Sequence, residues 1–201
     1  MKEYDKMISG SLYRSAKEEL VLLANKSRAL LDQINQTSHA DFDTRRTLFK
    51  ELFGALGKEA FINKPFYCDY GVNIEIGDNF YANFDLTILD VAKVTIGDRV
   101  MFGPKVSILS ATHPIDHEVR SSGLELGAPI TIGNDVWIGG NVVINPGVII
   151  GDRVIIGSGS VVTKDIPSDM IAAGNPCRVI RAINDDDKKY WEQQKIEYHL
   201  K

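Results

Sequence analysis

The sequence predicts a mainly β protein: a parallel β-helix of hexapeptide repeats, with a helical segment before it, an extruded loop within it and a helix after it. Three observations predict this fold. Aliphatic residues recur every six positions, at Ile132, Ile138, Ile144, Ile150, Ile156 and Val162. Another small or aliphatic residue stands four positions after each, at Val136, Val142, Val148, Val154, Ser160 and Ile166. Glycine directly follows four of the six leading residues, where a tight corner needs unusual backbone angles.

A period of six separates this fold from common alternatives. It does not match the 3.6-residue period of an α-helix, and it fits a short strand followed by a tight corner. Three strands and corners close a triangular coil of about 18 residues, and stacked coils bury each other's apolar side chains. A doubly wound α/β sheet would need helical stretches of roughly 10–15 residues between its strands, and the repeat leaves no room for them.

The repeat extends toward the N-terminus with two interruptions. Three earlier residues keep its phase: Ile96, Phe102 and Ile108. A still earlier run is shifted by two residues: Ile76, Ala82 and Ile88. The intervening segment "DVAKVT" is therefore predicted to carry a small irregularity. Residues 109–129 preserve the phase but lack the pattern, which predicts a loop that leaves the coil and returns in register.

Both ends of the chain are predicted to be helical. The segment "SAKEELVLLANKSRALLDQINQT" has an apolar helical stripe, and Ser15 with Glu18 matches a capping box. A second helix fits "DTRRTLFKELFGALG", with Gly57 as its stop. The acidic start of "DDDKKYWEQQKIEYHLK" favours a C-terminal helix. We expect these helices to cover the exposed coil edges. The predicted organisation is an N-terminal helical segment (1–58), a β-helix domain (59–183, with its loop at 109–129) and a C-terminal helix (184–201).

Composition bounds the class of protein. The chain has 201 residues, 44% hydrophobic and 25% charged, with a net charge of −4, so it carries no general affinity for nucleic acid. It has no run of 18 apolar residues and no apolar signal core at its N-terminus, which predicts no membrane span and no secretion. Cys68 and Cys177 lie far apart, as expected for reduced thiols in the cytoplasm.

His113 is the strongest candidate for chemistry. It lies where the coil opens into the loop, and loops on rigid scaffolds often carry function. Imidazole titrates near pH 6.5, which suits a general base, and Pro114 restricts the backbone of His113 to extended conformations. From residue type alone, a loop histidine that is hydrogen-bonded for structure is expected equally often. His117 is expected to be a solvated loop residue, and His39 and His199 to be surface residues.

Other candidates each have a plain structural alternative. Asn83 and Asp69 contact a ligand or simply form turns. Trp137 is a platform for a flat ligand or packs against a neighbouring subunit. Three cations past the last clear coils hold phosphates or are scattered surface charges: Lys164, Arg178 and Arg181. The sequence contains no Walker loop and no nucleotide-binding glycine fingerprint after a strand.

Five segments together resemble the maltose and galactoside O-acetyltransferases, which are hexapeptide-repeat enzymes. They are "KMISGSLYRSA", "CDYGVNIEIGDNFYANFD", "SATHPID", "NDVWIGGNVVINPGV" and "GSGSVVTKDIP…GNPCRVI". The resemblance runs from about Met7 to about Arg181. It implies a left-handed β-helix and a homotrimer with three active sites between neighbouring β-helices. Acetyl-CoA would lie along the groove between subunits, and the sugar acceptor would enter from the other end.

The resemblance also implies roles for single residues. His113 matches the catalytic histidine. Acceptor-side positions match Asn83, Asp69, Tyr81, Met101 and Ser15, with Tyr81 and Met101 at an apolar wall beside the sugar. Positions along the coenzyme match Trp137, Gly140, Ser158, Thr163, Lys164, Arg178 and Arg181. Galactoside-type relatives carry Asp at the positions of Ser15 and Val91 and Ser at that of Gly140, so the sequence looks closer to the maltose branch.

These observations predict transfer of acetyl from acetyl-CoA to a sugar hydroxyl, the 6-hydroxyl of a glucose- or maltose-type sugar. His113 would act as general base, and the backbone N–H of Gly140 would stabilise the oxyanion. Direct attack is favoured because no Ser or Cys beside a base stands out. Glu125 and Asp116 are both candidates to orient the imidazole.

Three alternatives remain at this level. The first is a trimeric metalloenzyme similar to γ-type carbonic anhydrases, in which His113 and His117 supply two ligands and a subunit interface a third. The second is an acetyltransferase for a non-sugar acceptor. The third is a non-catalytic scaffold. The favoured acetyltransferase would need no metal.

Overall fold

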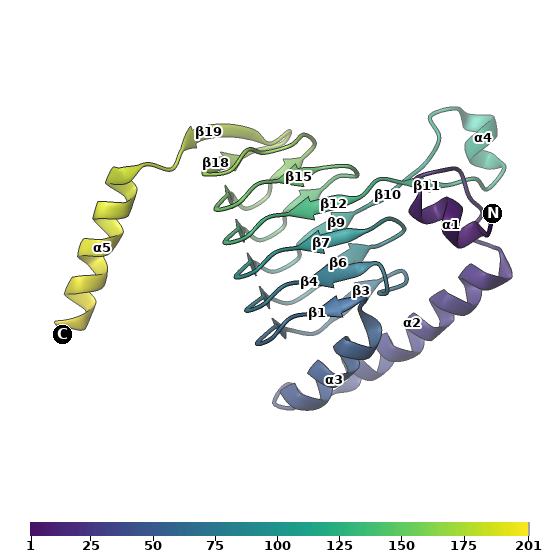
Figure 1. The fold of residues 1–201 in the computed structure, drawn as a ribbon, viewed down its shortest axis with the longest axis horizontal. Coiled ribbons are helices and arrows are strands. Elements are labelled where there is room, and N and C mark those ends of the chain that lie inside the picture. Colours follow the sequence, from purple (N-terminus) through teal and green to yellow (C-terminus); the bar gives the residue numbers. More distant parts are fainter. Residues whose placement is uncertain (201) are drawn as a thin grey trace.

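The computed structural model describes residues 1–200 and confirms the parallel β-helix (Figure 1). Its coils have three faces, and the chain visits them in turn. Face one stacks β1 (Ala55–Leu56), β4 (Ile74–Ile76), β7 (Val94–Ile96), β12 (Ile130–Ile132) and β15 (Ile149–Ile150). Face two stacks β2 (Phe61–Ile62), β5 (Tyr81–Ala82), β8 (Met101–Phe102), β13 (Trp137–Ile138), β16 (Ile155–Ile156) and β18 (Met170–Ala173). Face three stacks β3 (Phe66–Cys68), β6 (Leu86–Leu89), β9 (Ser107–Leu109), β14 (Val143–Ile144) and β17 (Val161–Val162).

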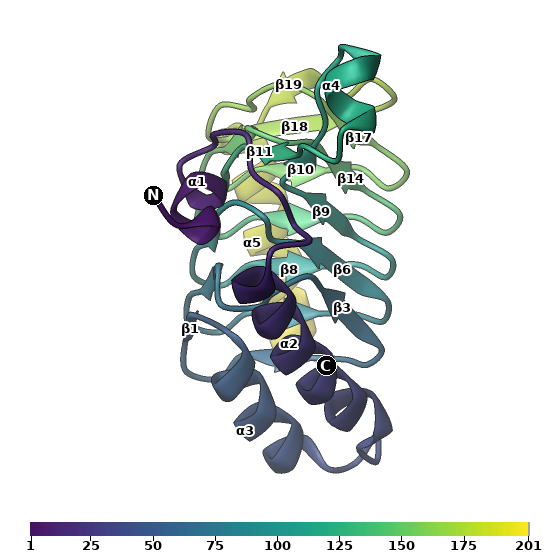
Figure 2. The same ribbon diagram turned by 90° about the vertical axis from the view of Figure 1, so that its right-hand side faces the viewer.

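The hexapeptide pattern correctly identifies the core. All twelve repeat residues from Ile132 to Ile166 are buried, none more than 4% exposed. Their columns line the inside of the coil, where each aliphatic side chain contributes about 1.5–3 kcal/mol by leaving water. The coil winds with the left hand that the resemblance implies (Figures 1 and 2).

The predicted irregularity is a change in coil length. Tyr81 pairs with Met101, 20 residues on, whereas Trp137 pairs with Ile155, 18 residues on. The lower coils therefore hold two more residues each than the upper ones. Strand β3 ends at Cys68 and β6 ends at Leu89, and the segments that follow them, 69–73 and 90–93, turn the corner from face three to face one.

The predicted loop leaves from the same corner. Met101 pairs with Trp137, 36 residues on, which equals two coils of 18, so the insertion preserves the phase. Strand β10 (Ala111–Thr112) and strand β11 (Leu126–Gly127) form an antiparallel hairpin stem, and a short helix α4 (His117–Ser121) lies between them. The buried Ser110 hydroxyl donates to the Leu89 carbonyl at 2.7 Å and accepts from the Ala92 amide at 2.9 Å, which ties the loop's base to the coil below.

Of the three N-terminal helices, α2 (Glu18–Gln36) and α3 (Phe42–Leu52) cover the lower end, and α1 (Glu3–Ile8) lies beside β11 of the loop stem (Figure 1). The predicted capping box is wrong, because α2 starts after Lys17 and the Ser15 side chain bonds elsewhere. Gly57 is not a helix stop either. It lies in the first coil after β1, where an added Cβ would sit 2.3 Å from the Gly77 carbonyl.

Arg45 joins the helices to the first coil. Its side chain belongs to α3, is 3% exposed, and donates to the carbonyls of Ile62 and Ser38, both at 3.1 Å. A buried guanidinium is costly unless its donors are satisfied, and here backbone carbonyls satisfy them. The turn between α2 and α3 is thereby fixed to face two.

The upper end differs from the prediction. A hairpin of β18 and β19 (Arg178–Ala182) closes the last coil, and α5 (Asp185–His199) projects away from the body, on the side opposite α1 and α2 (Figure 1). No residue within Asp185–His199 is buried, so this helix does not cover the coil edge. The antiparallel strand β19 occupies the edge position instead. None of the helices within residues 1–200 is both long and apolar enough to cross a membrane.

Candidate active site

His113 directly follows the hairpin stem and is exposed. Ala111 pairs with Gly127 and Thr112 with Leu126, so the antiparallel register places Glu125 across from His113. Side chains at directly opposed positions have Cβ atoms about 5 Å apart. Asp116 serves another purpose, since its carboxylate accepts from the Val119 amide at 2.9 Å and caps α4. Of the two carboxylates considered as orienting groups, Glu125 is the one in register with the histidine.

The N-terminal segment fixes Glu125. Tyr13 and Glu125 exchange backbone hydrogen bonds of 3.0 and 3.1 Å as an isolated antiparallel bridge. The Tyr13 hydroxyl donates to Glu125 Oε2 at 3.0 Å, and the Ser15 hydroxyl donates to Oε1 at 2.7 Å. Tyr13 is 1% exposed, and burial together with the Glu125 charge raises the pKa of its phenol, so it acts as a fixed donor. The segment is thus tied to the loop through Glu125, and contact of Ser15 with the acceptor stays a prediction.

Asp69 lies beside this group, in a pocket of about 270 Å³ that it shares with Ser15 and Arg28. Burial raises the pKa of Asp69 to about 6; the charge of Glu125 adds to this shift, and Arg28 opposes it. The structure therefore brings together three residues singled out in the sequence, Ser15, Asp69 and Glu125, next to the corner that bears His113. Arg28 carried no signal in the sequence because it sits in an ordinary helical pattern.

Asp90 organises the turn that carries Asp69. Its side chain is fully buried and accepts from the backbone amides of Asp69 at 3.1 Å, Tyr70 at 2.9 Å and Asn73 at 3.3 Å. Burial raises its pKa to about 6, and these hydrogen bonds oppose the shift. Sequence reasoning missed this residue. A carboxylate within the apolar run "LTILDVAKV" was the available signal, since buried acids are rare unless they are hydrogen-bonded.

A second group of predicted residues lies on face two. Tyr81, Met101 and Trp137 occupy the same register position on β5, β8 and β13, and form an outward column with exposures of 38%, 51% and 51%. Gly140 and Ser158 follow β13 and β16 at the corner between faces two and three. The Asn83 carboxamide oxygen accepts from the Phe84 amide at 2.8 Å, which is a turn contact.

The predicted phosphate-binding residues lie near the upper end. Thr163 and Lys164 follow β17 and are exposed, and Arg178 is an exposed residue of β19. Arg181 is engaged by Asp187 of α5 through two hydrogen bonds of 2.6 and 2.7 Å. Across residues 1–200, no three His, Cys, Asp or Glu side chains gather in a way that could hold a metal ion.

One chain keeps these groups apart. The corner with Gly140 stacks on Gly103, and the corner of the His113 loop begins near Leu109. Gly140 lies at the corner between faces two and three, whereas the His113 loop leaves from the corner between faces three and one. Face three therefore lies between the two groups within a single chain.

The fold and the repeat define a class, the hexapeptide-repeat transferases. Residues 129–164 match the family model described as bacterial transferase hexapeptide (six repeats), and residues 6–57 match the maltose acetyltransferase hexapeptide capping motif. Galactoside O-acetyltransferase of Escherichia coli is 47% identical over 187 residues, which cover 93% of this chain and 92% of that protein. The chain belongs to the maltose and galactoside O-acetyltransferase family.

Solved structures agree. A maltose O-acetyltransferase from Clostridium difficile is 48% identical with a TM-score of 0.91, covering 92% of this chain and 99% of that one. A galactoside acetyltransferase in complex with coenzyme A is also 48% identical, with a TM-score of 0.90 and 94% of each chain covered. Nodulation protein L of Rhizobium meliloti is 46% identical over 175 residues, 87% of this chain and 96% of that protein. Because the chain is 48% identical to both the maltose and the galactoside acetyltransferase structures, its assignment to the maltose branch stays a prediction.

Proposed function

We propose that this chain transfers the acetyl group of acetyl-CoA to a hydroxyl of a sugar, the 6-hydroxyl of a glucose- or maltose-type acceptor. The observation that carries the proposal is the hairpin stem that pairs Thr112 with Leu126, so that His113 and Glu125 follow at its open end, beside the pocket of Ser15 and Asp69. Family membership supports it: relatives are named for acetyl transfer to galactosides and maltose, and one solved structure holds coenzyme A.

In the proposed reaction His113 takes the proton of the sugar hydroxyl as its oxygen attacks the thioester carbonyl carbon. The Gly140 amide donates to the oxyanion of the tetrahedral intermediate. Collapse breaks the carbon–sulfur bond, and the imidazolium returns its proton to the departing thiolate. Glu125, held by Tyr13 and Ser15, stabilises the imidazolium by its negative charge. The products are the O-acetyl sugar and coenzyme A with a free thiol.

The acceptor pocket favours hydroxyl groups. Ser15 and Asp69 hydrogen-bond to a sugar, and the buried, apolar Val91 offers it no polar contact. Along the coenzyme, Trp137 offers an exposed ring and Lys164, Arg178 and Arg181 offer positive charge to phosphates. Arg181 must exchange Asp187 for a phosphate to do so.

The proposed assembly is a homotrimer in which His113 of one copy faces Gly140 and Trp137 of the next. The position of these groups at different corners of the coil within one chain, with face three between them, supports it. Closed cyclic symmetry brings the same two surfaces of neighbouring copies together three times.

A thiol-release assay tests the activity. Acetyl-CoA is offered with glucose, maltose, a thiogalactoside, serine and chloramphenicol, and the product is mapped by NMR. We expect release with glucose and maltose and acetylation at the 6-hydroxyl. Thiol release with serine or chloramphenicol, but with none of the sugars, would contradict a sugar as the acceptor.

A further inference from the structure

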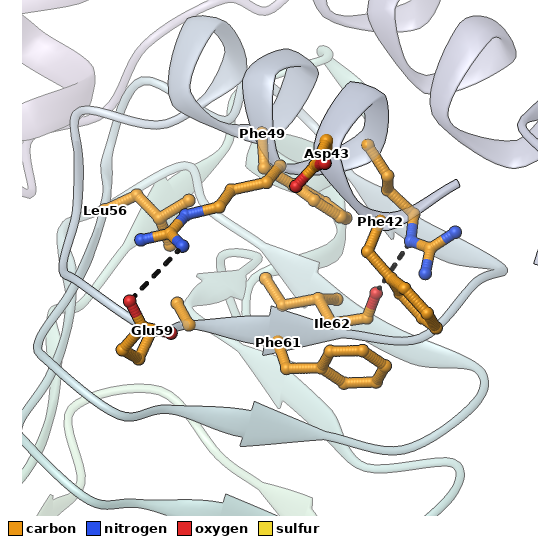
Figure 3. A pocket seen from close by; sticks show the side chains of 10 residues that line it. Phe42, Asp43, Phe49, Leu56, Glu59, Phe61 and Ile62 are labelled. Carbon is orange, nitrogen blue, oxygen red and sulfur yellow. Dashed lines mark hydrogen bonds and ion pairs between the residues drawn. The ribbon is translucent and has the colours of Figure 1, made fainter. Parts of the chain in front are cut away.

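A cavity of about 320 Å³ lies under α3, at the lower end of face two (Figure 3). Its apolar walls come from the helix and from the first coil: Phe42, Phe49, Leu56, Ala60, Phe61 and Ile62. Charged side chains complete the rim, among them Asp43, Arg46 and Glu59. The catalytic corner uses none of these residues.

The polar rim is incompletely bonded. Arg46 Nε is buried and has no hydrogen-bond partner within residues 1–200. The Arg46 guanidinium reaches Glu59 only at 3.8 Å, a long ion pair (Figure 3). The neighbouring Arg45 differs, since backbone carbonyls take up its donors. An unsatisfied buried donor is destabilising, and an acceptor oxygen of a ligand would satisfy it.

The aromatic wall continues to the predicted acceptor wall. Phe42 is 47% exposed and its ring centroid lies 4.9 Å from that of Phe61. Phe61 stacks on Tyr81, with centroids 5.8 Å apart and planes within 3°. The cavity is therefore one coil below Tyr81, about 5 Å along the β-helix axis, which is the length of one sugar residue.

We propose that this cavity is a second saccharide subsite, which holds the neighbouring sugar residue of a di- or oligosaccharide acceptor. The proposal rests on the proposed function for the place of the reacting sugar. A pyranose presents C–H faces to aromatic rings and hydroxyls that both donate and accept. Phe42 and Phe61 match the first, the Arg46 donor matches the hydroxyl oxygens, and the Asp43 and Glu59 carboxylates match the hydroxyl protons.

The charged side chains of the cavity favour a neutral saccharide over an anion or a fully apolar ligand. Two carboxylates, Asp43 and Glu59, line the cavity together with Arg46, the lining guanidinium that backbone carbonyls do not occupy. An anion would face repulsion from both, and a fully apolar ligand would leave the Arg46 donor unsatisfied. A neutral polyhydroxyl ring avoids both costs.

The test compares kcat/KM for maltose and glucose at saturating acetyl-CoA, in wild type, Phe42→Ala, Arg46→Gln and Tyr67→Ala. Tyr67 is the matched control, because it is an aromatic residue of the first coil, 50% exposed, on face three. One ring contact and one hydrogen bond together give an expected maltose preference of about tenfold in wild type and Tyr67→Ala. Phe42→Ala and Arg46→Gln each remove one of the two contacts, so we expect a smaller preference in both. Thermal midpoints identify any variant that fails to fold.

Saturation-transfer NMR with maltotriose and coenzyme A separates this proposal from the activity. We expect saturation on a second sugar ring in wild type, and its loss in Phe42→Ala. Glucose turnover with an unchanged maltose-to-glucose ratio in both cavity variants would overturn the subsite and leave the function intact. If no sugar is acetylated, the function fails, and the NMR result alone decides the subsite.

Discussion

The two halves of the candidate site are built in different ways. The His113 corner lies where coils are lengthened and a loop is inserted. Its polar groups are fixed by backbone amides that donate to Asp90 and by the Tyr13 hydroxyl, which donates to Glu125. The Trp137 column lies on a regular face, where the strands of neighbouring coils pair in continuous parallel register. The regular repeat supplies a flat binding surface, and departures from it supply the chemistry. Changes at the corner should therefore alter turnover, and changes on the face should alter coenzyme binding.

The largest effect is expected from His113→Ala. Loss of a general base lowers kcat by about 10²–10⁴-fold. The exposed position predicts little change in unfolding free energy, and coenzyme binding should persist because the face-two column is untouched. Steady-state kinetics and calorimetric titration with coenzyme A check both parts. A kcat within about threefold of wild type would remove His113 from the role of base.

Asp90→Asn should weaken the same corner by loosening the buried hydrogen bonds that hold its turn. The amide keeps the shape but can turn a donor toward three backbone N–H groups, which loosens the turn that carries Asp69. We expect kcat/KM for the sugar to fall about 5- to 100-fold, with KM for acetyl-CoA unchanged. A general loss of fold would impair both substrates alike, and thermal unfolding distinguishes that outcome.

Trp137→Ala should show the opposite pattern. Its ring is 51% exposed, so its removal leaves the core intact. Loss of one aromatic platform is expected to raise KM for acetyl-CoA about 5- to 20-fold with kcat nearly constant. An unchanged KM would indicate that the ring serves subunit packing instead.

The smallest effect is a pH dependence of stability. The pKa of Asp69 is raised to about 6 in the folded chain, so between about pH 4 and 6 the folded state binds more protons than the unfolded state. Its contribution to the unfolding free energy therefore falls as pH rises through this window and is constant above it. Denaturant unfolding of wild type and Asp69→Asn at about pH 4.5 and pH 7 measures the difference. Equal differences at both pH values would contradict the raised pKa.

The sequence predicted the regular part of the molecule well, for a physical reason. A period of six places Ile138 or Val154 inside the coil whatever surrounds it, because the stacking is local and repeated. The loop's phase followed from the same count. Features that depend on contacts between distant residues were not predicted. Ser15 matched a local helix cap, but its hydroxyl donates to Glu125, 110 residues away. The role of Asp90 depends on a corner shape that no periodicity encodes.

The prediction that the C-terminal helix covers the upper coil edge was wrong for a related reason. An acidic helical segment predicts α5 correctly, but helix propensity does not say where a helix packs. The antiparallel return of β19 occupies the last coil edge, and the pair of Arg181 with Asp187 joins α5 to that strand.

Subunit complementation tests most directly the claim that each site combines two different halves from two copies. His113→Ala and Trp137→Ala chains are unfolded together, refolded as mixed trimers and assayed at low acetyl-CoA. Random mixing restores both halves at about a quarter of the interfaces, so we predict activity of at least about a quarter of wild type, well above the mean of the two parents. Activity equal to the mean of the two separately refolded parents would contradict the claim, because it would place both halves within one chain.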